Sequence, residues 1–515
     1  MAILNSDADA NKHARAVVFK RRAGCVLHIT ALPGDGPVGD LTGAIAFASW
    51  MHERGLTVWQ ILPTGPCHDG PSPSPYSSWS DLSGNPWLIG LQPLRDAGLI
   101  HQDTPKSTIN GRVDFHTTQT TKMDLLCSAA QRFFNDPNHE WKPDYNAFMK
   151  RADWAIEAGL FWALRNHHNN LPWWQWPSDL ANRTAQALAH AQDTHREKIN
   201  IWTVLEFFFD RQYQTLRRHC DRLGVRLLGD LPIYVGKDSV DVWANQSIFQ
   251  TSTNGQFNEF GGVPPDAYSP QGQNWGNPTY HWPTHAQTNY AWWTRRIQRS
   301  LSLTHTLRID HFIGLVRYWA IPAHCKTGEV GRWVEGPGQQ LFDALQQHLG
   351  QLPLVVEDLG PVDNQTRALQ QHLGFPGMRV IQYGFGPDSG EEHQPNHHPK
   401  QSISYTSTHD TDTVMGWWNG LDETTQQQLA IPQGKTDIAS ELISMTLDSK
   451  ADWAIVPIQD WLGLGTQARF NVPGTTSGNW LWRVTFKQLN DIRTAPVRDV
   501  LIQTNRMQPP KVGSP

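Results

Sequence analysis

The amino-acid sequence predicts an α/β fold, a (β/α)8 TIM barrel that carries helical and loop-rich insertions. Two observations lead to this prediction. Eight short apolar runs alternate with segments of helical periodicity, and four of these runs end on or next to an acidic residue. Runs that are apolar along their whole length are typical of parallel strands, because both faces of such strands are buried. The expected strands are 24–28, 56–62, 226–230, 306–310, 353–357, 377–382, 403–408 and 453–458.

The chain is expected to begin with a polar tail over 1–22, followed by one barrel domain over 23–485. The first expected helix starts after Asp40, a residue type that caps helices, and stops at Gly55. The order strand, helix, strand implies a parallel pair of strands joined by a right-handed crossover. No internal repeat or low-complexity tract offers a competing architecture.

Two long insertions interrupt the alternation. The first, at about 87–200, shows mostly helical periodicity, and the long helix after it stops at Gly224. The second, at about 236–300, is rich in loop-forming residues and is expected to cover the cleft at the strand ends. We expect no separate C-terminal β-sandwich domain. Further helices are expected at 338–349, 363–373 and 436–448, and one helix with a polar tail at 486–515.

The overall composition excludes several classes of function. The 515 residues carry a formal net charge of −5 and a pI near 6.5, so there is no electrostatic footprint for a nucleic acid or a membrane surface. The sequence shows neither an apolar run that would span a bilayer nor a secretory signal. The five cysteines are scattered without C-x-x-C spacing. This pattern favours free thiols in a reducing compartment and therefore a cytoplasmic location.

Tryptophan is unusually frequent, with 24 residues. Any large protein buries some tryptophan in its core, but several here stand beside Gly, Pro and Asn, as Trp275 does. An indole in a loop offers a flat apolar face and a polar N–H. These properties suit a sugar ring, which has an apolar face and a rim of hydroxyls, so the composition suggests carbohydrate binding.

The acidic residues at the strand ends are candidate catalytic groups. Asp230, Asp310, Glu357 and Asp410 follow the third, fourth, fifth and seventh expected strands, and in a (β/α)8 barrel these ends surround one pocket. Carboxyl groups that share a pocket repel, so one can stay protonated while its neighbours ionise. Glycoside chemistry needs such a set, with one carboxylate attacking the sugar and another carboxyl protonating the leaving oxygen.

Each of these acidic residues also has a structural alternative. Asp230 is equally suited to start a turn, and Asp310 to form a buried ion pair with Arg308 two residues before it. Glu357 and the next residue would then be a loop pair with one solvated member, and Asp410 a helix cap. Four such residues at the ends of strands in one chain favour a shared site over four separate structural roles.

Several stretches of the sequence resemble the 4-α-glucanotransferases, the amylomaltase or disproportionating-enzyme family, which is related to the α-amylases. Four of them are similar to the signature regions of that family and contain the acidic residues above, namely 229–235, 307–312, 356–360 and 405–413. Further similar stretches are 74–76, 264–266, 272–278, 374–378 and 473–480. The resemblance covers the chain in order from about Gly24 to Arg483.

The resemblance implies a role for each of ten residues. Asp310 would be the nucleophile that forms a covalent glucosyl intermediate, Glu357 the general acid and then the base, and Asp410 the group that holds sugar hydroxyls and stabilises the transition state. Arg308 would orient Asp310 and keep it ionised, since an adjacent cation lowers the pKa of a carboxyl group. The other implied substrate-binding residues are Tyr76, which would stack on the transferred glucose, Asp230, Gln273 and Trp275 in the subsites, Tyr383 as an aromatic acceptor platform, and His409 as a donor to a hydroxyl.

Three residues depart from the pattern of many family members. Ile313 stands where many have Arg, Val356 where they have Ala, and Thr411 where they have Asn. These departures concern acceptor preference and the hydrogen bonds around the site. The family also implies that the loop at about 261–275 partly lids the cleft, which would favour a glycan hydroxyl over water as the acceptor.

We expect neither a cofactor nor a metal. Gly463-Leu464-Gly465 lacks the third glycine of a dinucleotide-binding loop. His393, His397 and His398 stand in a stretch rich in Pro and Asn without the spacing of metal ligands, which predicts a solvated loop. The implied partners are maltooligosaccharides and α-1,4-glucans, with no nucleic acid and no membrane, and the oligomeric state stays open.

Three functions fit the sequence. The leading one is the retaining transfer of an α-1,4-glucan segment from one maltooligosaccharide to the 4-OH of another glucan or glucose. The second is an α-amylase-like hydrolase, with water as the acceptor. The third is a catalytically silent glucan-binding protein on the same scaffold, and the complete set of Asp310, Glu357 and Asp410 argues against it.

Overall fold

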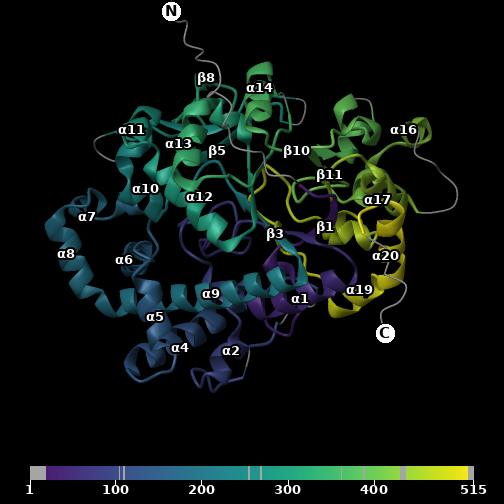
Figure 1. Ribbon diagram of the computed structural model, residues 1–515. Coiled ribbons are helices and arrows are strands. Elements are labelled where there is room, and N and C mark those ends of the chain that lie inside the picture. Colours follow the sequence, from purple (N-terminus) through teal and green to yellow (C-terminus); the bar gives the residue numbers. More distant parts are fainter. Residues whose placement is uncertain are drawn as a thin grey trace, which may run out of the picture.

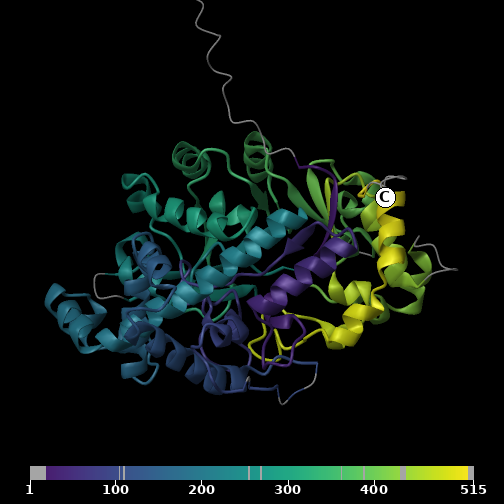
Figure 2. The same cartoon turned by 60° about the horizontal axis from the view of Figure 1, so that its bottom comes forward.

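We describe the protein from a computed structural model. The described residues are 19–507, without 104, 108, 110, 253–255, 267–268, 361, 387–388 and 430–436. Residues 1–18 of the expected N-terminal tail and 508–515 of the expected C-terminal tail lie outside the described residues. A central sheet is surrounded by helices, and one group of helices extends away from it (Figures 1 and 2).

Eight parallel strands form the central sheet, in the order β10-β11-β12-β1-β2-β3-β6-β9. They coincide with the eight apolar runs of the sequence, so the predicted (β/α)8 barrel is confirmed. On the remaining side, the Val356 N–H donates to the Pro376 carbonyl oxygen at 3.0 Å and links β9 to the residue before β10. The strands are β1 (Arg22–Val26), β2 (Val58–Gln60), β3 (Arg226–Leu231), β6 (Thr306–Ile309), β9 (Leu354–Val356), β10 (Gly377–Val380), β11 (Ser402–Tyr405) and β12 (Trp453–Pro457).

The close approach of β1 and β2 requires a glycine at one position. Gly24 pairs with Val58 in the parallel register, and a Cβ atom at Gly24 would lie only 2.1 Å from the Val58 carbonyl oxygen. Next to it, the buried Trp59 of β2 donates its indole N–H to the Leu27 carbonyl at 2.8 Å. A side chain at position 24 would therefore push these two strands apart.

Helices between consecutive strands pack around the outside of the barrel. The first, α1 (Leu41–Glu53), begins where predicted, because the Asp40 carboxylate accepts the N–H groups of Thr42 and Gly43 at 3.0 and 3.1 Å. The long helix α9 (Arg196–Leu223) ends at Gly224, whose φ of 69° lies in the left-handed region. The other helices of this layer are α12 (Ala291–Leu303), α13 (Gln339–Leu349), α14 (Asn364–Leu373), α15 (Val414–Gly420), α16 (Glu423–Gln428) and α17 (Ile438–Asp448).

The segment between β2 and α9 is mostly helical. It packs on α9 through aromatic rings, among them Phe133, whose centroid lies 5.6 Å from those of Phe207 and Phe208. The last two helices, α7 and α8, reach farthest from the barrel, at the left of Figure 1. The helices are α2 (Leu91–Asp96), α3 (Phe115–Thr117), α4 (Met123–Asn135), α5 (Lys142–Met149), α6 (Trp154–His167), α7 (Ser178–Ala181) and α8 (Ala185–Thr194).

A second sheet stands beside the barrel and was not predicted from the sequence. Four antiparallel strands lie in the order β5-β4-β7-β8. Two of them come from the segment that was expected to be loop-rich, which also contains α10 (Val240–Ala244) and α11 (Trp282–Gln287). The strands contain Gly, Asn and Pro, residues that rarely favour strands, so cross-strand pairing rather than intrinsic propensity forms them. They are β4 (Glu259–Val263), β5 (Gln273–Pro278), β7 (Arg317–Pro322) and β8 (Arg332–Glu335).

The chain after β12 forms α18 (Ile458–Trp461), α19 (Phe486–Asp491) and α20 (Thr494–Gln503), so two helices stand after residue 485 where one was expected. Just after α20, the buried Arg506 donates to carbonyl groups of residues 22, 447, 449, 451 and 452 at 2.6 to 3.2 Å. Arg506 thereby joins the end of the described chain to the amino-terminal ends of β1 and β12. In the described part of the chain, no helix is long and apolar enough to cross a membrane.

We expect Arg506→Met to lower the free energy of unfolding by about 3 kcal/mol, because it leaves several buried carbonyl groups without a donor. Chemical denaturation measures the change. The turnover number should stay unchanged, since Arg506 lies at the end of the barrel opposite the acidic strand ends. Arg498→Met on α20 is the matched control, because Arg498 is only partly buried and makes one 3.4 Å hydrogen bond, to the Glu53 carbonyl. Equal stability of the two variants would contradict the prediction.

Candidate active site

The acidic strand ends meet at one face of the barrel, as predicted. Asp230 lies within β3, Asp310 directly follows β6, Glu357 directly follows β9, and Asp410 stands in the loop after β11. They surround or lie just behind a cleft of about 1430 Å³. Eight of the ten predicted site residues line this cleft, namely Tyr76, Gln273, Trp275, Arg308, Asp310, Glu357, Tyr383 and Asp410. Asp230 and His409 lie behind the cleft surface.

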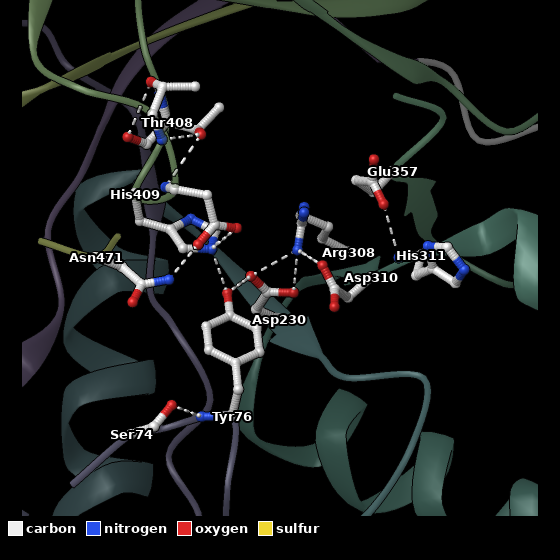
Figure 3. A network of polar contacts seen from close by, with 12 residues as sticks. Ser74, Tyr76, Asp230, Arg308, Asp310, His311, Glu357, Thr408, His409 and Asn471 are labelled. Carbon is white, nitrogen blue, oxygen red and sulfur yellow. Dashed lines mark hydrogen bonds and ion pairs between the residues drawn. The ribbon is translucent and has the colours of Figure 1, made fainter. Parts of the chain in front are cut away.

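Arg308 is the centre of a polar network below the cleft (Figure 3). It lies directly opposite Asp230 in the register of β3 and β6. Its Nη1 donates to both carboxylate oxygens of Asp230, at 2.7 and 2.9 Å, and lies 2.8 Å from Asp310 Oδ1. Burial lowers the pKa of Arg308, but the charges of Asp230 and Asp310 outweigh burial and hold the guanidinium protonated. Asp310 therefore forms the ion pair with the buried Arg308 and also faces the shared pocket, so both interpretations of Asp310 hold.

Tyr76 connects this centre to the loop after β11. Its hydroxyl donates to Asp230 Oδ2 at 2.7 Å and accepts from His409 Nε2 at the same distance. The two rings are nearly parallel, with centroids 5.3 Å apart. The side chain of Asp230 is fully buried and bonded to Arg308 and Tyr76, so direct contact between Asp230 and a sugar stays a prediction.

Asp410 is held from two directions. Its Oδ2 lies 3.1 Å from His409 Nε2, and its Oδ1 accepts from Asn471 Nδ2 at 2.6 Å. Arg469 also donates to the Asp410 backbone carbonyl at 2.7 Å. Burial raises the pKa of Asp410, but His409 and the hydrogen bond from Asn471 outweigh it and hold the pKa below its usual range. Asp410 is therefore the most readily ionised of the three carboxyl groups in the cleft.

Glu357 is held by backbone N–H groups. Oε2 accepts from the His311 N–H at 2.8 Å, and Oε1 accepts from the Leu359 N–H at 2.9 Å. His311 has a φ of 50° and a ψ of 55°, the left-handed region that a histidine seldom adopts. This conformation lets the residue after Asp310 direct its N–H at Glu357. Among the described residues, no basic side chain forms an ion pair with Glu357.

The two carboxyl groups differ in proton affinity. Burial raises the pKa of Asp310 to about 6, while Arg308 opposes the shift. Burial and the charge of Asp310 raise the pKa of Glu357 to about 7. The expectation that Arg308 lowers the pKa of Asp310 is correct in direction, but burial has the larger effect. At neutral pH, Asp310 is mostly ionised, while a substantial fraction of Glu357 keeps its proton.

Glu357 and Asp358 do not form a loop pair with a solvated member. The side chain of Asp358 is fully buried, its Oδ1 accepts from the Met378 N–H at 2.7 Å, and its Oδ2 pairs with Arg379 at 3.0 Å. These contacts fix the end of β9 against β10. They hold Glu357, the neighbouring residue, at the cleft.

Aromatic side chains form the walls of the cleft. Trp275 of β5 meets the His311 ring edge-on with centroids 4.8 Å apart, and its indole N–H donates to Gln273 at 3.2 Å. On another wall Tyr383, in a short 3₁₀ helix (Ile381–Gly384), meets the edge of His393 at 5.5 Å. These positions fit substrate contacts by Gln273, Trp275 and Tyr383, and their roles stay predictions.

The predicted solvated loop around His393 is wrong for two of its three histidines. His393 and His398 are 8% and 1% exposed. His393 accepts the Val380 N–H at 3.2 Å, and His398 Nε2 bonds to the His393 carbonyl at 2.9 Å. Each of these two rings makes a hydrogen bond to the backbone, and a segment rich in Pro and Asn packs against the barrel. In the described ranges, no group of three His, Cys, Asp or Glu side chains is placed to hold a metal ion.

The three departures from the family pattern lie close to the site. Ile313 is buried in the 3₁₀ helix after His311 (Phe312–Leu315), and Val356 is buried in β9. Thr411 Oγ1 accepts the Thr408 N–H at 2.9 Å and lies within the loop that carries Asp410. Thr411 therefore supplies a hydrogen bond inside this loop.

Arg469 and Asn471, which hold Asp410 from the far side, were not predicted from the sequence. The similar stretch at 473–480 begins two residues after Asn471. A polar residue just before that stretch was the available signal. No local pattern indicates that it reaches the loop after β11.

Three carboxyl groups in an aromatic-walled cleft, at the carboxyl ends of barrel strands, define a class of protein: a (β/α)8 enzyme that acts on sugars. The sequence profile described as 4-alpha-glucanotransferase matches residues 27–489. The chain belongs to the 4-alpha-glucanotransferase family and is a glycosyl-transferring enzyme.

Relatives agree with this result. The chloroplastic/amyloplastic 4-alpha-glucanotransferase of Arabidopsis thaliana is 39% identical over 474 residues, which cover 90% of this chain and 82% of that protein. The 4-alpha-glucanotransferase of Thermus thermophilus is 36% identical over 499 residues, covering 95% and 99%. The amylomaltase from Streptococcus agalactiae in complex with acarbose superposes with a TM-score of 0.91 at 31% identity, covering 95% of this chain and 100% of that one.

The pKa values of Asp310 and Glu357 predict a bell-shaped dependence of kcat/KM on pH. Transfer should increase as pH rises through about 6, where Asp310 ionises, and decrease as pH rises through about 7, where Glu357 loses its proton. Initial rates between pH 4 and 9 measure the profile. An acidic limb near pH 4, where ordinary carboxyl groups titrate, would contradict the raised pKa of Asp310.

The left-handed backbone of His311 leads to a second prediction. We expect His311→Val to have a kcat about tenfold below that of His311→Asn, because a β-branched residue disfavours this conformation by about 1–2 kcal/mol and asparagine tolerates it. Both variants remove the imidazole ring. The difference between their kcat values therefore reports on the backbone N–H that donates a hydrogen bond to Glu357. Steady-state kinetics of the two purified variants give the ratio. Equal turnover numbers would show that the conformation of residue 311 does not limit the reaction.

Proposed function

We propose that this 4-α-glucanotransferase moves a segment of an α-1,4-glucan by double displacement, with Asp310 as the nucleophile and Glu357 as the acid and base. The observation that carries the proposal is the difference between these two groups. Asp310 pairs with a buried cation at 2.8 Å, whereas Glu357 bonds to backbone N–H groups and has the higher pKa. One carboxyl group is thus suited to attack and the other to donate a proton.

In the first step, an Asp310 oxygen forms a bond to the anomeric carbon of the donor. The glycosidic bond breaks, its electron pair stays on the leaving oxygen, and the Glu357 proton goes to that oxygen. Arg308 holds Oδ1 of Asp310, so the other carboxylate oxygen is available for the attack. Asp410, kept ionised by His409 and Asn471, would hold hydroxyls of the distorted sugar and offset the positive charge that develops on its ring.

In the second step, Glu357 takes the proton of the 4-OH of an acceptor glucan. The acceptor oxygen bonds to the anomeric carbon, and the ester bond to Asp310 breaks. Two inversions give net retention. The cleft of about 1430 Å³ is large enough for several sugar rings, and the aromatic rings of Trp275 and Tyr383 offer faces on which they can stack. Maltooligosaccharides and longer α-1,4-glucans are the substrates that this cleft fits.

The cellular location and the alternative of hydrolysis remain expectations from the sequence. The cytoplasmic location stays a prediction from the scattered cysteines, and the name of the Arabidopsis thaliana relative places that protein in plastids. Hydrolysis with water as the acceptor is the second candidate function, because it uses the same three carboxyl groups. Only the products distinguish hydrolysis from transfer.

Incubation with maltotriose followed by product sizing tests the proposal. Transfer predicts free glucose together with chains longer than maltotriose, because a segment removed from one molecule is added to another. Asp310→Ala should lower the rate by at least about 10³-fold, since the covalent step is lost. That variant should still bind maltooligosaccharides.

The matched control is Asp422→Ala, which removes an exposed helix-capping carboxylate outside the cleft and should keep the wild-type products. Shorter sugars without elongation would establish hydrolysis in place of transfer. Full activity of Asp310→Ala would exclude Asp310 as the nucleophile.

A further inference from the structure

We infer that Asp460 is a positioning residue, which holds the loop carrying His409 and Asp410 in the geometry that the reaction needs. The inference rests on the proposed function, because it assumes that Asp410 acts on the sugar in the cleft. Asp460 lies in α18, directly after β12, and neither the sequence motifs nor the site described above includes it.

One carboxylate of Asp460 binds both ends of this loop. Oδ2 accepts from the hydroxyls of Thr406 and Ser407 at 2.6 and 2.5 Å, where the chain leaves β11. Oδ1 accepts from the Val414 N–H at 2.9 Å, where α15 begins. The six residues between Ser407 and Val414 include His409 and Asp410. A single side chain thus sets the span of the loop.

The burial of Asp460 makes these contacts strong determinants of geometry. The residue is 1% exposed, and no cation among the described residues forms an ion pair with it. Burial raises the pKa of Asp460 to about 6, and the hydrogen bonds from Ser407, Thr406 and Val414 oppose the shift. A buried carboxylate without a countercharge needs several donors in fixed places. Displacement of the loop would remove these donors, so the loop and the carboxylate hold each other in place.

The middle of the loop depends on the same part of the chain. The Asp410 N–H donates to Thr408 Oγ1 at 3.2 Å within the loop, and the Asp412 carboxylate accepts from Thr466 at 2.7 Å. Arg469 and Asn471 hold the carbonyl and the carboxylate of Asp410. The segment from Asp460 to Asn471 therefore contacts the loop at its ends and at Asp410 itself.

A purely structural role would make Asp460 important for stability alone. Positioning makes a different prediction, because contacts with a distorted sugar strengthen in the transition state. Displacement of Asp410 should then lower kcat while the KM for maltotriose changes little. The separation of kcat from KM distinguishes the two roles.

The experiment measures kcat, KM and thermal unfolding of the full-length Asp460→Ala enzyme with maltotriose. We expect kcat to decrease about 10–100-fold, as for a misplacement of about 1 Å in an active site, with KM within about threefold of wild type. Asp452→Ala is the matched control, since it removes a buried carboxylate from the opposite end of β12. Its kcat should stay within about twofold of wild type.

A second variant tests the same contacts from the loop. Thr406→Val with Ser407→Ala removes both hydroxyl donors with little change in volume, and it should lower kcat in the same way. When combined with Asp460→Ala, the effects should be non-additive, because both changes break one interaction. If Asp460→Ala fails to fold, the loop variant alone decides: a wild-type kcat overturns the inference, and a lowered kcat with unchanged KM supports it.

Wild-type kcat in folded Asp460→Ala, or fully additive effects in the combined variant, would also overturn the inference. The wild-type reaction run in parallel separates this failure from failure of the proposed function. If the wild-type enzyme elongates maltotriose, transfer stands whatever the Asp460 variants do.

Discussion

The site depends on one buried guanidinium. Arg308 is 3% exposed, and transfer of its charge from water into the barrel costs several kcal/mol unless carboxylates compensate for it. Asp230 and Asp310 provide that compensation at 2.7 to 2.9 Å, and Tyr76 satisfies the remaining side of Asp230. The loss of any one of these partners leaves a charge or a donor unpaired in a largely buried place. The strand register sets the geometry, because Asp230 and Arg308 stand opposite each other in β3 and β6.

Around this centre, similar side chains acquire different properties from different neighbours. Asp230 is fully buried and serves as a countercharge, whereas the side chain of Asp310 is 25% exposed and reaches the cleft. Glu357 has backbone N–H groups in place of a cation, and Asp410 has His409 and Asn471. The barrel brings these groups together at the carboxyl ends of separate strands, so each one is tuned by the residues that follow its own strand.

Local sequence patterns predicted the elements whose own residues indicate them. All eight barrel strands could be located because parallel strands, buried on both faces, are apolar along their length. The antiparallel sheet could not, because strands such as Glu259–Val263 and Gln273–Pro278 depend on partners distant in sequence. The same limit explains the wrong prediction for His393, whose burial follows from contacts with β10, and the omission of Asn471. The acidic residues could be found because each one stands at the end of an apolar run in the sequence. Their pKa values could not be predicted, because these depend on burial in the folded structure.

The pairing of the first strand with the last has a consequence for synthesis in the cell. Residues 22–26 of β1 pair with 453–457 of β12, so the barrel cannot close until the chain through residue 457 has left the ribosome. At about 5–20 residues per second, the intervening chain of about 430 residues takes roughly 20–90 s to be made. During that time one edge of β1 lacks its partner strand, and apolar residues that the finished barrel buries remain exposed. Such long-range closure favours late, chaperone-assisted completion of the fold, in which the pairing of β12 with β1 is the last step.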